Sequence, residues 1–304
     1  MLVKKFKYIL LLPILIIVAA IIVGIFSGGL NMGIDFTGGN IMTIDVGEEF
    51  DTDVIRESLV KYDAEDAPVV KVGDTMAEIR SKETDEAKQQ ELSQNILEDI
   101  QQTYPDAQIE TIDRVGGIAS KELILNAFFA VLLACALMLI YIWIRFTLFS
   151  GLSAIICLLH DILIMTAVVC IVRLQINSSY IAACLTIVGY SINNTIVLYD
   201  RIRENESKLG SKEYTQAQIA DMSVKQTLNR TINTSVTTLI TIAVLYILGV
   251  DSIKEFALPI IVGLIAGTYS SVLMAAPIWI LLEGKFRKKG KKGKMVKRKR
   301  KVVR

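Results

Sequence analysis

Six long apolar segments alternate with polar stretches along the chain. A helix of about 20 apolar residues is long enough to cross the hydrocarbon core of a bilayer. The connections between the last five segments are short, except for residues 200–231, which are polar and are expected to carry an amphipathic helix around Ala217–Leu228. We therefore predict six transmembrane helices, at about Tyr8–Phe26, Leu123–Ile144, Phe149–Val172, Tyr180–Tyr199, Ile232–Leu248 and Phe256–Leu282.

The stretch between the first two apolar segments is soluble in character, and its hydrophobic period changes several times. Alternating residues indicate strands, whereas apolar residues at helical spacing indicate amphipathic helices. Asp51 or Thr52 is placed to cap the first of these helices. The predicted order of strand, helix, strand, strand, helix and strand is IMTIDV, Asp51–Tyr62, APVVKVG, TMAEIRS, Asp85–Thr103 and AQIETIDRV, with Gly73-Asp74 as the hairpin turn. This βαββαβ order is the ferredoxin-like pattern of an α+β domain.

The charge distribution suggests four parts. Residues 30–120 contain 21 acidic and 7 basic residues, whereas residues 285–304 contain 13 basic residues and no acidic one. We expect the N-terminus and first transmembrane helix in residues 1–29 and the ferredoxin-like domain in residues 30–120. The other five helices are expected in residues 121–284, followed by a basic tail in residues 285–304.

Basic residues in short connections predict the orientation in the membrane, because they concentrate on the cytoplasmic side. Lys4, Lys5 and Lys7 precede the first helix, and the connection after the fourth helix is also rich in Lys and Arg. The chain is thus expected to have both termini in the cytoplasm and its acidic domain outside. The first apolar run resembles a signal peptide, but it is too long and lacks a clean cleavage site, so we expect an uncleaved helix.

The basic tail, Lys285–Arg304, has a high density of like charges and few apolar residues, which is typical of disorder. Such clusters bind anionic lipid next to a transmembrane helix. Two other interpretations are a topology anchor and binding to ribosomal RNA through its phosphates. No specific nucleic-acid recognition is expected.

Composition excludes several classes of function. The chain is 52% hydrophobic, and its four cysteines all lie in apolar segments, so they indicate neither a disulfide framework nor a zinc site. The sequence contains no catalytic triad, nucleotide-binding motif or metal-ligating cluster. We therefore expect no enzymatic activity, no metal and no cofactor.

An ionisable pair, His160-Asp161, lies near the middle of the third apolar segment, and His160 is the only histidine in the chain. A charge at the bilayer centre costs about 3 kcal/mol or more, so such residues are interpreted as functional by default. The alternative is that Asp161 is protonated and serves as a buried hydrogen-bonding group.

Two further apolar segments carry polar residues. In the fourth, the amides of Asn193 and Asn194 predict either a polar pathway or hydrogen bonds that join packed helices. In the fifth, one face carries Arg230, Thr234, Thr237, Thr238 and Thr241. We favour a hydrated path or relay along the two segments. The alternatives are that Arg230 extends to the cytoplasmic interface and that the threonines bond to their own helix.

Two glycine-containing motifs predict local geometry. In GIDFTGG, residues 33–39, the glycines permit positive φ and a tight turn into the domain. Asp35 is a candidate cap or ligand, and the missing Lys-Ser/Thr excludes a phosphate loop. In the sixth segment, small residues recur every fourth position and predict close helix packing: Gly263, Gly267, Ser271 and Ala275.

The motifs GIDFTGG, HD, GYSINNTIVLYDRIREN and RTINTSVTTL occur in this order within six predicted spans. Together they resemble the SecF family, subunits of the bacterial SecD–SecF protein-export accessory, in the resistance-nodulation-division superfamily. The resemblance extends to about Leu282. The residues that carry it include Gly33, Asp35, Gly38, Gly39, Gly189, Tyr190, Asn193, Asp200, Arg201 and Arg203.

The resemblance implies a location in the bacterial plasma membrane and pairing with SecD as two pseudo-symmetric six-helix halves. It also implies association with the SecY–SecE–SecG translocon and with YajC and YidC. The complex would use a proton or sodium gradient to help preproteins leave on the outer side. On this basis the ion-coupling candidates are His160, Asp161, Asn194, Arg230 and Thr234.

The sequence departs from the family pattern at Asn194, where the family commonly has a carboxylate near residues that match Arg230 and Thr234. An asparagine cannot titrate, so Asp161 or carboxylates of SecD would have to carry the ion. We expect ion entry to change the charge of the polar residues, repack the helices and move the acidic domain. The alternatives are a structural subunit that carries no ion and half of a small-molecule transporter of the same superfamily.

Overall fold

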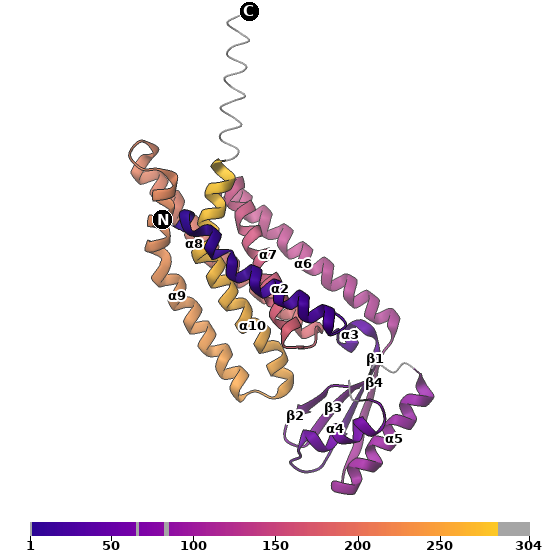
Figure 1. Ribbon diagram of the computed structural model, residues 1–304. Coiled ribbons are helices and arrows are strands. Elements are labelled where there is room, and N and C mark those ends of the chain that lie inside the picture. Colours follow the sequence, from indigo (N-terminus) through magenta and orange to yellow (C-terminus); the bar gives the residue numbers. More distant parts are fainter. Residues whose placement is uncertain (1, 65–66, 82–84, 285–304) are drawn as a thin grey trace, which may run out of the picture.

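The computed structural model describes residues 2–64, 67–81 and 85–284 of the 304-residue chain. Six helices in this part of the chain are long and apolar enough to cross a membrane. They lie side by side, and a small sheet with two helices extends from one end of the bundle (Figure 1). The prediction of a polytopic helical protein with one α+β unit is thus confirmed. The basic tail, Lys285–Arg304, lies outside the described residues.

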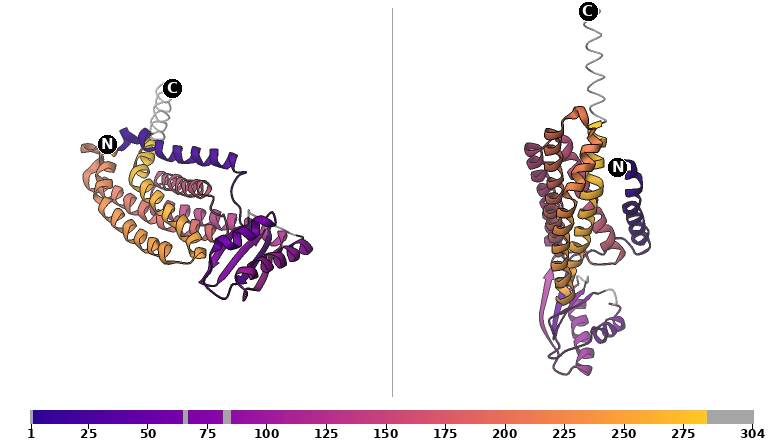
Figure 2. Two further views of the ribbon diagram at one scale, coloured as in Figure 1. Left: turned by 60° about the horizontal axis from the view of Figure 1, so that its bottom comes forward. Right: turned by 90° about the vertical axis from the view of Figure 1, so that its left-hand side faces the viewer.

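The first spanning helix is broken near its N-terminal end, into α1 (Leu2–Ile9) and α2 (Leu11–Phe26). The break follows from Pro13, which has no N–H to donate to the carbonyl of the residue four positions earlier. Helix α2 lies at one side of the bundle, as the right-hand view in Figure 2 shows. It packs against α7 through Ala20, Ala167 and Cys170.

Five spans follow the sheet region. Their order is α6 (Gly117–Arg145), α7 (Leu148–Ile171), α8 (Ser178–Glu213), α9 (Gln216–Leu248) and α10 (Asp251–Tyr269). Helix α10 passes into a π-helical turn, η1 (Ser270–Met274), and then continues as α-helix to Gly284. Helices α7, α8 and α10 supply most of the buried residues of the bundle, whereas α6 is largely exposed.

The connection at residues 200–231 differs from the prediction. There is no separate amphipathic helix, because α8 continues to Glu213 and α9 begins at Gln216. Charged pairs one turn apart extend α8 beyond its apolar part, since Glu204 accepts from Arg201 and Lys208, each at 2.6 Å. Hydropathy detects only the part of each helix that suits hydrocarbon, so the predicted end of α8 was too early and the predicted start of α9 was too late.

The sheet unit has the predicted βαββαβ order. Its elements are β1 (Gly39–Asp45), α4 (Thr52–Lys61), β2 (Val69–Val72), β3 (Met76–Ser81), α5 (Glu86–Thr103) and β4 (Gln108–Val115). The strands form one antiparallel sheet in the order β2-β3-β1-β4, with Met42 opposite Ile79. Asp51 and Asp85 cap the two helices, so Asp51 and not Thr52 is the first N-cap.

Apolar residues on one face of the sheet pack against α4 and α5 and form a core separate from that of the bundle. Its fully buried members include Ile44 and Ile79 from the sheet, Ile55 from α4, and Ile96 and Ile100 from α5. These helical residues recur at the spacing that places them on one face of each helix. The opposite face of the sheet is therefore left for contacts with the bundle.

GIDFTGG forms a short helix, α3 (Ile34–Thr37), that the sequence did not predict. Gly38 and Gly39 have φ of 78° and 143°, values that require glycine. Gly33 has ordinary φ but lies against the chain before α8, where an added Cβ would be 3.1 Å from Cβ of Asn177. The motif thus turns the chain into β1 and packs closely on the loop between α7 and α8.

Candidate functional site

A buried carboxylate joins three helices in the middle of the bundle. Asp161 of α7 has no exposed surface. Its Oδ2 accepts hydrogen bonds from Oγ of Ser191 in α8, at 2.5 Å, and from Oγ of Ser270 in η1, at 3.0 Å. Its Oδ1 lies 2.9 Å from Nδ1 of His160. The carboxylate is therefore fully surrounded by protein groups, as a buried charge or a buried hydrogen-bonding acid requires.

Small residues let α8 and α10 approach this carboxylate. At Gly267, an added Cβ would lie 3.1 Å from the Ser191 side chain and 3.5 Å from Oδ2 of Asp161. At Gly263, it would lie 2.4 Å from Cγ1 of Ile187. Ser271 is also buried and donates a hydrogen bond to the Gly267 carbonyl. This stripe therefore sets the distance between α8 and α10 at the level of the site.

The π-helical turn lies directly beside Asp161. Such turns widen a helix by one residue and are frequent at functional sites. Ser270 and Ser271 are consecutive, yet both are buried, and Ser270 also donates to the Gly267 carbonyl. The wider turn thus provides the local geometry in which Ser270 bonds to Asp161.

His160 links the carboxylate to the first helix. Its ring stacks on Tyr269, with the centroids 6.2 Å apart and the planes at 17°. Nε2 of His160 is buried and has no hydrogen-bond partner among the described residues. The ring borders a cavity of about 240 Å³ whose wall includes Leu12 and Pro13 of the first helix. His160 and Asp161, predicted from the sequence as an ionisable pair, are therefore in contact in the structure, and the first helix lies close to them.

The asparagines of α8 point in different directions. Asn194 is buried and its Nδ2 has no partner within the described part of the chain, whereas Asn193 is exposed. Thr195 is buried and donates to the Ser191 carbonyl. Exposed positions recur on one face of α8 at Ala182, Thr186, Gly189 and Asn193, and Tyr190 is half-buried.

The polar face of α9 does not reach the carboxylate. Arg230 is exposed and Thr234 is half-buried. The threonines bond to their own helix, as in the 2.8 Å contact from Oγ1 of Thr234 to the Arg230 carbonyl. Among the described residues, no hydrogen bond joins this face to Asp161 or Asn194. The structure thus brings together His160 and Asp161 but places Arg230 and Thr234 elsewhere.

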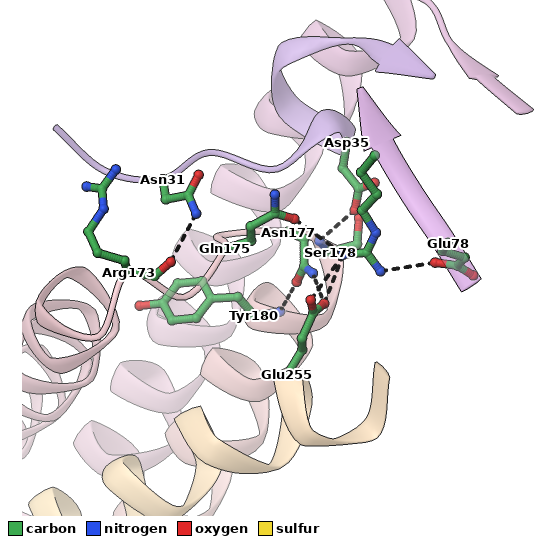
Figure 3. Close-up of polar contacts among 10 residues, drawn as sticks. Asn31, Asp35, Glu78, Arg173, Gln175, Asn177, Ser178, Tyr180 and Glu255 are labelled. Carbon is green, nitrogen blue, oxygen red and sulfur yellow. Dashed lines mark hydrogen bonds and ion pairs between the residues drawn. The ribbon is translucent and has the colours of Figure 1, made fainter. Parts of the chain in front are cut away.

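The DRIREN motif, residues 200–205, lies at one end of the bundle. At the opposite end, the GIDFTGG motif bonds to the start of α8 (Figure 3). Oδ2 of Asp35 accepts a 2.8 Å hydrogen bond from the backbone N–H of Ser178, the first residue of α8. A negative charge at a helix N-terminus is stabilising, because the first N–H groups lack helical partners. Backbone bonds also join Gly33 and Asn31 to Ile176. Asp35 is therefore a cap of a distant helix.

An ion pair between the sheet and α10 completes this junction. Nη1 of Arg80 in β3 lies 3.0 and 3.2 Å from the two carboxylate oxygens of Glu255. Nδ2 of Asn177, the N-cap of α8, donates to the same carboxylate at 2.9 Å (Figure 3). Burial lowers the pKa of Arg80, but the nearby charges and hydrogen bonds of Glu255 and Glu78 outweigh it and raise the pKa overall.

Sequence reasoning missed this junction. Its members are single polar residues in a strand, a loop and a helix start, 175 positions apart in the case of Arg80 and Glu255. One available signal was the alternation in β3, which places Glu78 and Arg80 on the face opposite the apolar core.

The DRIREN motif holds three helices together at the other end of the bundle. Asp200 pairs with Arg145 of α6 at 3.1 Å. Arg201 donates to Gln226 of α9 at 2.8 Å, and Arg203 donates to the Arg145 carbonyl at 3.3 Å. These contacts are structural links between α6, α8 and α9.

Comparisons with known proteins agree with the motifs. Residues 95–285 match the family model described as "Protein export membrane protein SecD/SecF, C-terminal", and residues 23–48 match the "SecD/SecF GG Motif". The chain is 37% identical to a SecF translocase subunit of Sebaldella termitidis, over 89% of this chain and 87% of the relative. It is 34% identical to one of Borreliella burgdorferi, over 90% of this chain and 94% of the relative.

Solved structures of a longer protein have the same fold. A crystal structure of SecDF from Thermus, described as a translocon-associated membrane protein, matches with a TM-score of 0.77 and 31% identity over 93% of this chain. A second SecDF structure, in a super-membrane-facing form, matches with a TM-score of 0.67 over 95% of this chain. In both cases the chain spans 38% of the length of SecDF.

Proposed function

This chain belongs to the SecD/SecF family of protein export membrane proteins, among relatives that are SecF translocase subunits, and from that premise we propose that it couples an ion gradient to a late step of preprotein translocation. We further propose a bacterial plasma-membrane location with both termini in the cytoplasm. The sheet unit then lies on the outer side, where preproteins emerge, and the DRIREN end of the bundle lies at the cytoplasmic surface.

The observation that carries the proposal is the buried Asp161 and its hydroxyl donors from two other helices. An ionised carboxylate only accepts hydrogen bonds, whereas a protonated one must also donate. A change of protonation, or binding of a sodium ion, therefore alters the contacts with Ser191 and Ser270. Because an unsatisfied polar group is costly in this setting, α8 and α10 would shift against α7.

The same two helices extend from Asp161 to the sheet. Ser191 lies 13 residues after Ser178, and Ser270 lies 15 residues after Glu255, so each helix covers about 20 Å between the site and the junction. At the junction, Ser178 bonds to Asp35 and Glu255 pairs with Arg80. A shift of α8 against α10 would therefore change the position of the sheet. This is how ion binding would become motion on the outer side.

SecD is the partner that the SecDF relatives imply. The exposed polar face of α8 and α9 supports an interface there, because exposed polar groups are unfavourable in lipid. It includes Thr186, Gly189, Asn193, Asn233 and Thr237. Arg230 and Thr234, on the same side of α9, would then act with groups of SecD. Association with SecY–SecE–SecG, YajC and YidC stays a prediction from the family resemblance.

A second candidate function is a structural subunit that stabilises SecD without carrying an ion. Asn194 favours it, since this buried amide cannot change charge. Under this alternative, Asp161 is a permanently protonated acid that holds α7, α8 and α10 together.

Replacing Asp161 by Asn separates the two functions. The complex with SecD is reconstituted into vesicles, and preprotein export is measured with and without a proton or sodium gradient. We expect the Asp161→Asn complex to assemble, measured by co-purification, and to lose stimulation by the gradient. Asp200→Asn is the matched control, since Asp200 is an exposed acid at the end of the bundle that carries the DRIREN motif. Normal stimulation in an assembled Asp161→Asn complex would support the structural function instead.

A further inference from the structure

A cavity of about 270 Å³ lies where α6 ends and α7 begins, and residues of α8 and of the helix that follows η1 complete its wall. Arg145 and Arg203 both border it, together with the hydroxyl-bearing Thr147 and Ser150 and the indole of Trp279. It is far from Asp161 along the helices, since Ser150 precedes that residue by three turns of α7. The ion-coupling proposal does not use this cavity.

The two arginines are held in place by other groups. Nη2 of Arg145 pairs with Asp200 at 3.1 Å, and its guanidinium lies 5.2 Å from the centre of the Phe146 ring. Nη1 of Arg203 donates to the Arg145 backbone carbonyl at 3.3 Å. A guanidinium has five N–H donors, and these are the hydrogen bonds that each one makes among the described residues. Both arginines therefore have donors left for an anion.

The position of the cavity indicates what kind of anion would reach it. It lies at the ends of spanning helices, beside the exposed apolar side chains of Trp143, Ile144 and Leu148. The boundary between hydrocarbon and water therefore passes at this level. Basic pockets between transmembrane helices at such a boundary bind lipid headgroups. Paired guanidinium groups match the geometry of phosphate oxygens.

We propose that this cavity binds the phosphodiester headgroup of a membrane phospholipid. The phosphate accepts from Arg145 and Arg203. The hydroxyls of Thr147 and Ser150 bond to each other at 2.9 Å, so one of them still has its proton for a further hydrogen bond. The acyl chains lie on the exposed apolar surface of α6. The bound lipid joins α6, which has few buried residues of its own, to the rest of the bundle.

The test measures lipid retention by native mass spectrometry of the full chain, with phosphatidylethanolamine and phosphatidylglycerol as probes. We expect one tightly held phospholipid on the wild type and about tenfold weaker retention on Arg145→Gln/Arg203→Gln, which loses both charge-assisted contacts. Arg201→Gln is the matched control, because Arg201 lies in the same motif but contacts Glu204 and Gln226. It should retain lipid as the wild type does.

Arg203→Lys tests the site even where the double variant folds poorly, since it keeps the charge but loses the planar fork. We expect it to retain less lipid than Arg201→Lys. Inorganic phosphate and glycerol phosphate are added as soluble competitors and should not displace the lipid. Equal retention by Arg203→Lys and Arg201→Lys would overturn the proposal, and so would displacement of the lipid by soluble phosphate.

Discussion

The hydroxyl of Tyr269 donates a 2.5 Å hydrogen bond to the backbone carbonyl of Ile9. This carbonyl lies four residues before Pro13, so it is the one that proline deprives of a helical donor. Tyr269 therefore supplies the hydrogen bond that this carbonyl lacks within the first helix. The ring of Tyr269 stacks on His160, which is beside Asp161. The first and last spans are thus joined at the level of the candidate ion site.

Removing the Tyr269 hydroxyl should destabilise the protein through this carbonyl. Tyr269→Phe keeps the stacked ring but removes the donor to this half-buried carbonyl, at a cost of about 1 kcal/mol. We expect a lower midpoint in thermal denaturation of the detergent-solubilised chain. Tyr8→Phe, at an exposed tyrosine of the same region, should have no effect.

Restoring the helical donor should rescue that variant. Pro13→Ala returns an N–H that bonds to the Ile9 carbonyl, so the loss from Tyr269→Phe should be smaller in the Pro13→Ala background. Equal losses in both backgrounds would mean that the hydroxyl acts through something other than Ile9.

Breaking the ion pair of the junction should loosen the sheet from the bundle. Arg80 and Glu255 are mostly buried, with 12% and 14% of their side chains exposed, so Arg80→Gln leaves Glu255 with an unpaired charge. We expect a loss of about 3–5 kcal/mol at this contact. Hydrogen exchange should become faster in β2 and β3 and in the first turns of α10.

Arg56→Gln is the control for this prediction. Arg56 forms an exposed ion pair with Asp53 in the same α+β unit, and an exposed pair contributes little to stability. Arg80→Gln/Glu255→Gln should recover part of the loss by removing the unpaired carboxylate. If exchange in β2, β3 and α10 is unchanged in Arg80→Gln, the ion pair does not hold the junction closed.

An added methyl group should destabilise the protein at Gly263, in the small-residue stripe of α10, but not at Gly189, on the exposed face of α8. Gly263→Ala places a Cβ 2.4 Å from Cγ1 of Ile187, so overpacking should cost about 1–3 kcal/mol. Gly189→Ala meets no atom within 4 Å in the isolated chain and should stabilise α8 by up to about 1 kcal/mol. Thermal denaturation of both variants checks this.

The same Gly189→Ala variant also tests the proposed SecD interface. Since Gly189 lies on the exposed polar face of α8, a methyl group there should weaken co-purification with SecD while the isolated chain stays stable. Unchanged co-purification would place the SecD contact on another face.

Removing the acceptor at Asp35 should affect α8. Asp35→Ala leaves the Ser178 N–H without its side-chain acceptor and should cost about 1 kcal/mol, as for other helix caps. Asp35→Asn keeps an oxygen acceptor but loses the charge, so its effect should be smaller. Hydrogen exchange at the start of α8 distinguishes the two variants, and equal protection in Asp35→Ala and the wild type would contradict the capping role.

The sequence alone determined most elements of this protein, though not the short helix α3 or the π-helical turn η1. Runs of apolar residues specify membrane helices, because each backbone group must be satisfied within its own segment in lipid. Alternation and helical spacing specify the strands and helices of the α+β unit, since one face of each must be buried. Both signals are local, which is why six spans and a βαββαβ unit could be predicted, while the extensions of α8 and α9 into water could not.

Only the tertiary structure decided which polar residues meet. Asp161 contacts Ser191 and Ser270 because small residues let α8 and α10 approach there, whereas the more conspicuous threonines of α9 bond to their own helix. Arg80 reaches Glu255 because the open face of the sheet lies over the ends of α8 and α10. Contacts between distant segments depend on how helices pack, and no periodic pattern within one segment records that packing.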